Sequence, residues 1–143
     1  MSTLKRHSLL VDEAIESLGI DPQKCKNDNP NAWTLHRGKL DVIIIIQESR
    51  ITDQKTTPTI TIMCPLCQID EKNEHFILKK AMEVNHKLTI ETLSVSNRWL
   101  IISSTYFIDE MTKKEIIDLI ENLSYQAHYI EDKNLFHSAP KNI

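Results

Sequence analysis

The spacing of hydrophobic positions changes several times along the chain, and each change marks a new element of secondary structure. Over residues 3–18 apolar side chains recur at spacings of three, four and seven, the period of an amphipathic helix. Gly19 can take the left-handed conformation that ends a helix, and Pro22 prevents continuation. Residues 22–31 are polar and have no period. We therefore predict a first helix over residues 3–18 and then a loop.

The next two segments have the composition of strands. Residues 33–36 and 40–47 are rich in β-branched and aromatic side chains, and Gly38 lies between them, which predicts a hairpin. Four isoleucines follow Val42 without alternating with polar residues. Because strands with this pattern are usually buried on both sides, we expect a helix to cover one face of this strand and another chain or segment to cover the other.

A third strand follows after a polar stretch. Residues 48–58 are mostly polar, and we predict that they form a connection. Residues 59–63 then alternate between threonine and apolar side chains, as a half-buried strand does. Pro65 has no N–H to donate to a ladder, so we expect it to end this strand.

The second half of the chain repeats the change from helix to strand. Apolar residues at helical spacing predict a helix over residues 70–88. Residues 89–95 alternate, and residues 99–103 are apolar and β-branched, with Asn97 and Arg98 between them as the reversal of a second hairpin.

The last helix has a clear start. Thr112 and Glu115 have the spacing of a capping box, in which each side chain binds the other's backbone amide. A stripe of apolar residues follows for four to five turns, formed by Ile116, Ile120, Leu123, Ala127 and Ile130. The whole order is helix, three strands, helix, two strands, helix. It predicts an α+β fold with an antiparallel sheet of about five strands and three helices, as one domain over residues 1–137 with a flexible tail over residues 138–143.

Composition removes several classes of function. The chain has 17 Lys and Arg against 20 Asp and Glu, a formal net charge of −3, so no overall positive field attracts nucleic acid. Its apolar runs are far shorter than the roughly 20 residues that cross a bilayer. No export signal is visible, and three cysteines are an odd number for a disulfide framework, so we expect a cytoplasmic protein.

Few residues point to chemistry. Only two glycines are present, too few for a loop that cradles the phosphates of a nucleotide, and we expect no cofactor. The six histidines share no motif, and we expect no catalytic residues.

Cys64 and Cys67 form the most suggestive motif, because two thiols at this spacing can bind zinc or cycle as a dithiol. A zinc site needs two more ligands, and Cys25, His75 and His86 show no second paired spacing. A redox pair normally opens a helix, whereas these cysteines leave a strand. We therefore interpret them as structural and expect no metal site, with a small zinc or thiol protein as an alternative.

The order of elements resembles the fold shared by class I type III secretion chaperones and YbjN-like proteins. The resemblance covers the chain from residue 4 to about residue 135, and it depends on the apolar strand at 42–46, the strand end at 62–66, the helix end at 78–85 and the last helix at 116–129. It implies a homodimeric bacterial cytoplasmic protein without catalytic activity.

The resemblance also implies what such a protein binds. A chaperone of this kind holds an extended segment of a secreted effector against apolar grooves and sheet edges, by groove filling and strand addition. The alternative within the same fold is a YbjN-like regulator or adaptor that binds a folded partner.

The same resemblance places candidate contact residues on the first helix and on the middle helix. On the first helix they are Leu10, Val11, Ala14 and Ile15, for which core packing is an equal alternative. Trp33 and Trp99 each open a strand, and one of them is a candidate anchor for a partner, although tryptophans at such positions usually form the edge of a core with the indole N–H in water. The resemblance places the dimer interface on the middle helix, with Phe76, Lys80 and Val84 as the candidates.

Overall fold

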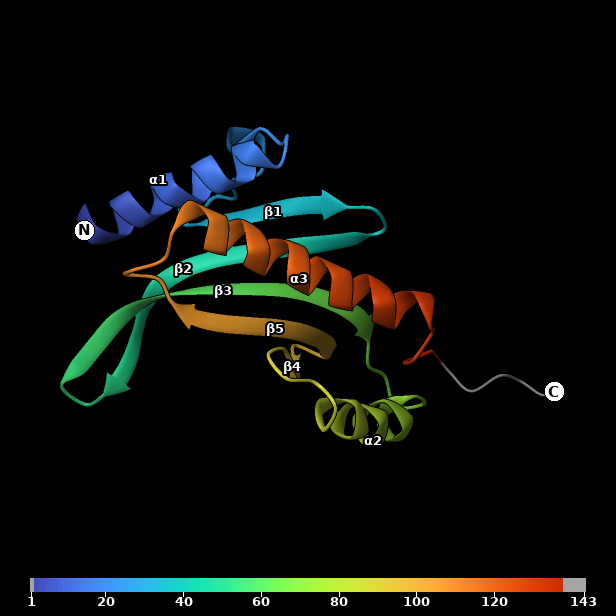
Figure 1. Cartoon of the computed structure of the whole chain (residues 1–143). Helices are drawn as coiled ribbons and strands as arrows, with labels where there is room; N and C mark the ends of the chain where they lie inside the picture. Colours follow the sequence, from blue (N-terminus) through green and yellow to red (C-terminus); the bar gives the residue numbers. More distant parts are fainter. Residues whose placement is uncertain (1, 138–143) are drawn as a thin grey trace.

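The computed structural model describes residues 2–137, and the order of its helices and strands is the predicted one (Figure 1). The elements are α1 (Ser2–Ser17), a 3-10 turn η1 (Pro22–Lys24), β1 (Ala32–Arg37), β2 (Leu40–Thr52), β3 (Lys55–Gln68), α2 (Glu74–Asn85), β4 (Thr92–Ser96), β5 (Trp99–Phe107) and α3 (Lys113–Asp132). The α+β fold class, with three helices and a five-stranded antiparallel sheet, is confirmed. The predicted tail at 138–143 lies outside the described residues.

The strands form one antiparallel sheet in the order β1-β2-β3-β5-β4. Helices α1 and α3 pack against each other and against one face of this sheet, while α2 lies beside the edge strand β4 (Figure 1). The core fills the space between the two helices and the sheet. Its largest buried side chains from the strands are Trp33, Leu35, Ile44, Ile46, Ile60, Ile62, Leu100 and Ile102.

The prediction of a polar connection over residues 48–58 was wrong. Strands β2 and β3 continue through this stretch, pairing Glu48 with Pro58 and Arg50 with Thr56, up to a two-residue turn at Asp53 and Gln54. The hairpin extends beyond the other strands (Figure 1). Most side chains of this extension are exposed, so apolar and polar residues do not alternate along it. Only its threonines, which favour strands, indicate the strand in the sequence.

Pro65 does not end the third strand as predicted. Strand β3 runs to Gln68, and its register with β5 shifts between Pro65 and Cys67. Such a bulge places the residue without an N–H where the ladder is already interrupted.

The two faces of the isoleucine run are buried to different extents. Val42, Ile44 and Ile46 are buried, whereas Ile43 and Ile45 are only half-buried. Within residues 2–137, helices α1 and α3 therefore cover only one face of β2, and its apolar side chains on the other face remain partly accessible.

The predicted signals for turns and helix ends are confirmed. The Thr112 hydroxyl accepts a hydrogen bond from the Glu115 amide at 3.2 Å, and the Glu115 carboxylate accepts one from the Thr112 amide at 2.9 Å. Gly19 has a φ of +84° where α1 ends. Asn97 and Arg98 have φ values of +50° and +63°, as the two central residues of a tight β4–β5 turn require.

Candidate functional site

Within residues 2–137, the face of the sheet turned away from α1 and α3 is not covered by a helix and leaves apolar side chains accessible. Strand registers align Thr34, Ile43, Met63, Ser103 and Thr92 in one row across all five strands. We define the open face as the half-buried or exposed side chains of this row and its neighbours: Thr34, Ile43, Ile45, Thr61, Met63, Thr92, Ile101, Ser103 and Thr105.

The nine side chains of the open face are apolar or carry a hydroxyl, and the pair of Asp41 and His36 lies beside them on the same face of β2 and β1. The hydroxyls of Thr61 and Thr105 are 2.9 Å apart and hydrogen-bonded across β3 and β5. Phe107, 64% exposed, lies at one end of β5, and Trp99, 38% exposed, lies at the other. A contiguous surface of this kind is typical of a protein interaction site.

A cavity of about 570 Å³ adjoins the open face at the Trp99 end, and we call it the Trp99 groove. Pro65, Trp99 and Ile101 form part of its wall, so the groove shares Ile101 with the open face. The β1–β2 turn contributes Lys39 and the start of β2 contributes Asp41, while Glu131 comes from the last turn of α3. The groove is therefore bordered by apolar side chains together with two carboxylates and one ammonium group.

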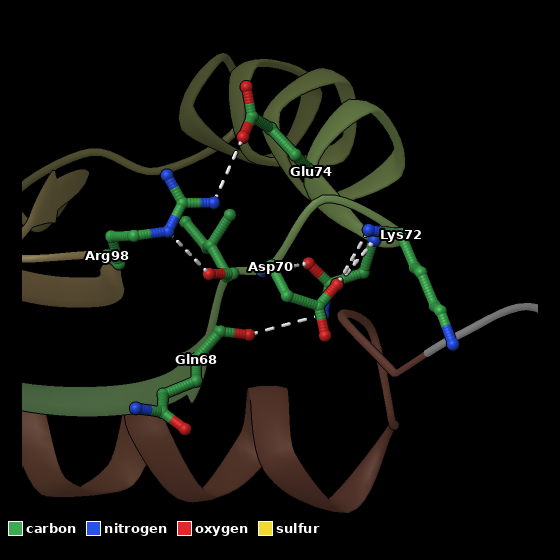
Figure 2. Close-up of polar contacts among 7 residues, drawn as sticks. Gln68, Asp70, Lys72, Glu74 and Arg98 are labelled. Carbon is green, nitrogen blue, oxygen red and sulfur yellow. Dashed lines mark hydrogen bonds and ion pairs between the residues drawn. The ribbon is translucent and has the colours of Figure 1, made fainter.

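A polar network fixes the turn that presents Trp99 (Figure 2). Arg98 donates from Nε to the Ile69 carbonyl at 3.0 Å and from Nη2 to Glu74 at 3.2 Å, and its own carbonyl accepts from the Ile69 amide at 2.8 Å. Asp70 accepts from the amides of Lys72 and Asn73, which orders the approach to α2. These bonds join Arg98 to the segment between β3 and α2. Because Trp99 follows Arg98 directly, they also fix the position of Trp99 in the groove wall.

The carboxylates of the groove also act on the neighbouring cysteines. Burial raises the pKa of the Cys64 thiol to about 12, and the negative charges of Asp41 and Glu131 add to this effect. The pKa of Cys67 is raised by burial and by Glu131. Both thiols are therefore protonated near neutral pH, the opposite of what a reactive cysteine needs. Within residues 2–137 no three His, Cys, Asp or Glu side chains are grouped as metal ligands would be.

Both edges of the sheet are partly closed. Beside β1, the Thr34 amide donates to the Cys25 carbonyl at 2.8 Å and the Asn27 amide donates to the Ala32 carbonyl at 3.0 Å. Beside β4, the side-chain amide of Asn85 binds both the N–H and the carbonyl of Leu93. Strand addition, which the resemblance implied, is thus restricted to the remaining parts of these edges.

Most of the candidate residues on α1 lie in the core. Val11, Ala14 and Ile15 are fully buried, and Leu10 is half-buried. They cannot touch a partner while α1 keeps this position, so their assignment to a substrate groove stays a prediction without support from the geometry.

The two tryptophans have different environments. Trp33 is fully buried, and its Nε1 donates to Asp12 on α1 at 3.0 Å. Its indole N–H therefore binds a carboxylate, whereas the sequence predicted that it would lie in water. The Lys26 ammonium lies 5.6 Å from its ring centroid. Trp33 therefore holds α1 against the sheet, and Trp99 is the tryptophan that a partner can reach.

Helix α2 carries accessible apolar residues, but only some are those predicted for the dimer interface. Phe76 is exposed, whereas Lys80 and Val84 are half-buried and Val84 packs on the core. Leu78 and Met82, 39% and 75% exposed, form an additional apolar pair one turn apart. Their spacing of four is visible in the sequence, where it supports only the prediction of a helix over residues 70–88.

Comparison with solved structures identifies the fold as that of type III secretion chaperones. The chain is similar to a chain of the ExsC–ExsE complex, with a TM-score of 0.62 and 8% identity over 94% of this chain and 97% of that one. It is also similar to a chain of the HopA1–SchA chaperone–effector complex, with a TM-score of 0.62 and 9% identity over 92% and 98%.

A third match is a chain of the Yersinia pestis type III secretion chaperone SycH in complex with a stable fragment of YscM2, with a TM-score of 0.55 and 12% identity over 85% and 97%. No family model and no curated protein sequence matches the chain. The similarity therefore lies in the fold, which the predicted resemblance to this chaperone group described correctly. In residues 2–137 no helix is long and apolar enough to span a membrane.

Proposed function

We propose that this protein is a non-catalytic, type III secretion chaperone-like module that holds an extended segment of a partner protein, such as a secreted effector. One observation carries the proposal: among residues 2–137, a sheet face of apolar and hydroxyl side chains lies uncovered and continues into the Trp99 groove. Two similar structures were solved as a chaperone–effector complex and as a chaperone with a protein fragment, which supports a protein partner.

The chemistry of the surface favours an extended, partly apolar segment. Ile43, Met63 and Ile101 would be removed from water by a partner's apolar side chains, at about 25 cal/mol for each Å² of apolar area buried. The hydroxyls of Thr61 and Thr105 would exchange hydrogen bonds with the partner's backbone. Because the edges are partly closed, contact with the face is expected to contribute more than main-chain pairing along β1 or β4.

The direct test is co-expression with proteins encoded beside it, purification of any complex, and limited proteolysis. We expect the partner to contain a protected segment that becomes protease-sensitive when it is released. Met63→Lys should abolish the complex because it places a charge in the centre of the open face. Leu9→Lys, at an exposed position on α1 away from this face, is the matched control.

Two outcomes contradict the proposal. One is a complex that survives Met63→Lys with unchanged affinity, which would place the partner elsewhere. The other is a partner that stays compact and protease-resistant after release, which would favour the YbjN-like adaptor. A cytoplasmic location is part of the same proposal, and fractionation of cells that express the protein would check it.

We further propose that the protein is a homodimer formed through α2. Phe76, Leu78 and Met82 leave large apolar surfaces on this helix, and Val95 on the adjacent β4 is also exposed. Lysines and glutamates lie between them on α2, so two copies related by a two-fold axis can place opposite charges against each other.

A further inference from the structure

The Trp99 groove differs from the open face in its charge, and this difference restricts what it can accept. Asp41 and Glu131 both line the groove although they come from β2 and α3. Among the described residues, Asp41 pairs only with the exposed His36, at 2.5 Å, and Glu131 pairs only with His137, at 3.4 Å. Histidine is charged only when protonated, so neither carboxylate is paired with a permanent cation.

The two carboxylates place two negative charges along one groove. After burial, which is the main cause, the charges of both also raise the pKa of Cys64, the residue before Pro65 in the groove wall. The Glu131 side chain is 24% exposed, so its charge is screened less by water than that of a free surface carboxylate. The groove therefore carries more negative than positive charge.

Lys39 also borders the groove but does not neutralise it. It makes no ion pair with any described residue within 4.0 Å, and one ammonium group stands against two carboxylates. Its flexible side chain extends from the β1–β2 turn, where it can point into water.

The rest of the groove suits the long aliphatic part of a basic side chain. Pro65, Leu66 and Ile101 offer apolar surface, and Trp99 presents an aromatic ring that attracts a cation over its face. An acidic side chain here would meet two like charges, and a purely apolar one would desolvate Glu131 without adding a positive charge.

We infer that the Trp99 groove binds a lysine or arginine side chain of the partner segment, directly beside an apolar side chain that packs on the open face. The inference deepens the proposed function and rests on it for the identity of the occupant as a protein segment. It predicts that segments held by this protein carry an apolar residue next to a basic one at the point that reaches β5.

The test uses two capped dipeptides that differ in charge but hardly in shape: acetyl-leucyl-arginine amide and acetyl-leucyl-citrulline amide. The readout is the indole N–H resonance of Trp99 in a ¹⁵N–¹H spectrum of the full chain, assigned by its disappearance in Trp99→Phe. We expect the arginine peptide to shift this resonance saturably at low ionic strength and the citrulline peptide to bind at least about fivefold more weakly.

Variants of the groove separate charge from shape. The double variant Asp41→Asn with Glu131→Gln should reduce the affinity for the arginine peptide by about fivefold or more, whereas Lys39→Met should leave it equal or higher. Asp41 is exposed and Glu131 is half-buried, and an unchanged dispersion of the remaining resonances would show that the variant is folded.

The inference is overturned if both dipeptides bind equally, if the double variant keeps its affinity, or if millimolar arginine peptide leaves the Trp99 resonance unmoved. These results can be told apart from failure of the proposed function. Loss of arginine binding with an intact partner complex would refute only the groove assignment, while arginine binding without any protein partner would refute only the proposed function.

Discussion

Asn85 binds the backbone of Leu93 with both ends of its side-chain amide. Its Oδ1 accepts from the Leu93 N–H at 2.7 Å, and its Nδ2 donates to the Leu93 carbonyl at 3.0 Å. The amide thus takes the place of a neighbouring strand along part of the β4 edge, and it joins the end of α2 to the sheet.

Replacing this amide should destabilise the fold. We expect Asn85→Ala to lower the free energy of unfolding by about 2 kcal/mol, because two backbone groups of the buried Leu93 lose their partner. Asn85→Asp should cost at least as much near neutral pH, since its second oxygen would face the Leu93 carbonyl. Denaturant unfolding of both variants checks this, with Asn122→Ala, at an exposed position on α3, as the control. Unchanged stability of Asn85→Ala would contradict the assigned role.

Gly38 and His128 provide a second prediction about stability. Gly38 has a φ of +66°, and a Cβ placed there would lie 3.0 Å from His128 Nε2. That ring contacts the carbonyls of Arg37 and Ser124, each at 2.8 Å, and so ties α3 to the β1–β2 turn. We expect Gly38→Ala to cost about 1–2 kcal/mol from backbone strain and crowding together.

A double-mutant cycle with His128→Ala separates the two causes. Removing the ring relieves the crowding but not the strain, so the cost of Gly38→Ala should become smaller in the His128→Ala background without vanishing. Full additivity of the two substitutions in denaturant unfolding would show that the ring and the new methyl group do not interact.

The sequence predicted the fold correctly because its local signals are strong. The capping box at Thr112 and the turn residues Asn97 and Arg98 each specify a backbone conformation directly. Pro65 gave a misleading signal, because tolerance of a missing N–H depends on a bulge that forms only when β3 pairs with β5.

The candidate site was less predictable for a related reason. Val11, Ala14 and Ile15 are apolar on one side of a helix, and nothing in that pattern distinguishes a core surface from a binding surface. The Trp99 groove joins Asp41 to Glu131, 90 positions apart, and only the packing of α3 on the sheet brings them together.

The reactivity of the cysteines should follow their raised pKa. With a pKa of about 12, Cys64 has roughly one part in ten thousand as thiolate at pH 8, since each unit of pKa is a factor of ten. We therefore expect alkylation of Cys64 by iodoacetamide in the folded protein to be slower by orders of magnitude than in urea. Mass spectrometry of alkylated peptides measures this.

The expected order of alkylation follows from burial. Cys25 and Cys67 are half-buried and should react faster than Cys64, although their raised pKa also slows them relative to an exposed thiol. Rapid modification of Cys64 in the folded state, or zinc bound in stoichiometric amount after purification, would revive the interpretation of Cys64 and Cys67 as a functional pair.

The last prediction concerns assembly through α2. If the proposed dimer is correct, light scattering should give twice the 16.6 kDa mass of the chain, and Met82→Lys should reduce it to one chain. The substitution introduces two like charges near the two-fold axis, where burial makes their repulsion costly. Because Met82 is 75% exposed in the single chain, the substitution should not destabilise the monomer. The variant should unfold at the same denaturant concentration as the wild-type chain diluted until it is monomeric.

A matched control distinguishes this effect from a general change in charge. Leu9→Lys places the same charge at a similarly exposed apolar position on α1, and it should leave the dimer intact. A wild-type protein that stays at one chain mass up to millimolar concentration would refute the dimer. A dimer that persists in Met82→Lys but dissociates in Leu9→Lys would move the interface to α1, and the apolar residues of α2 would then need another partner.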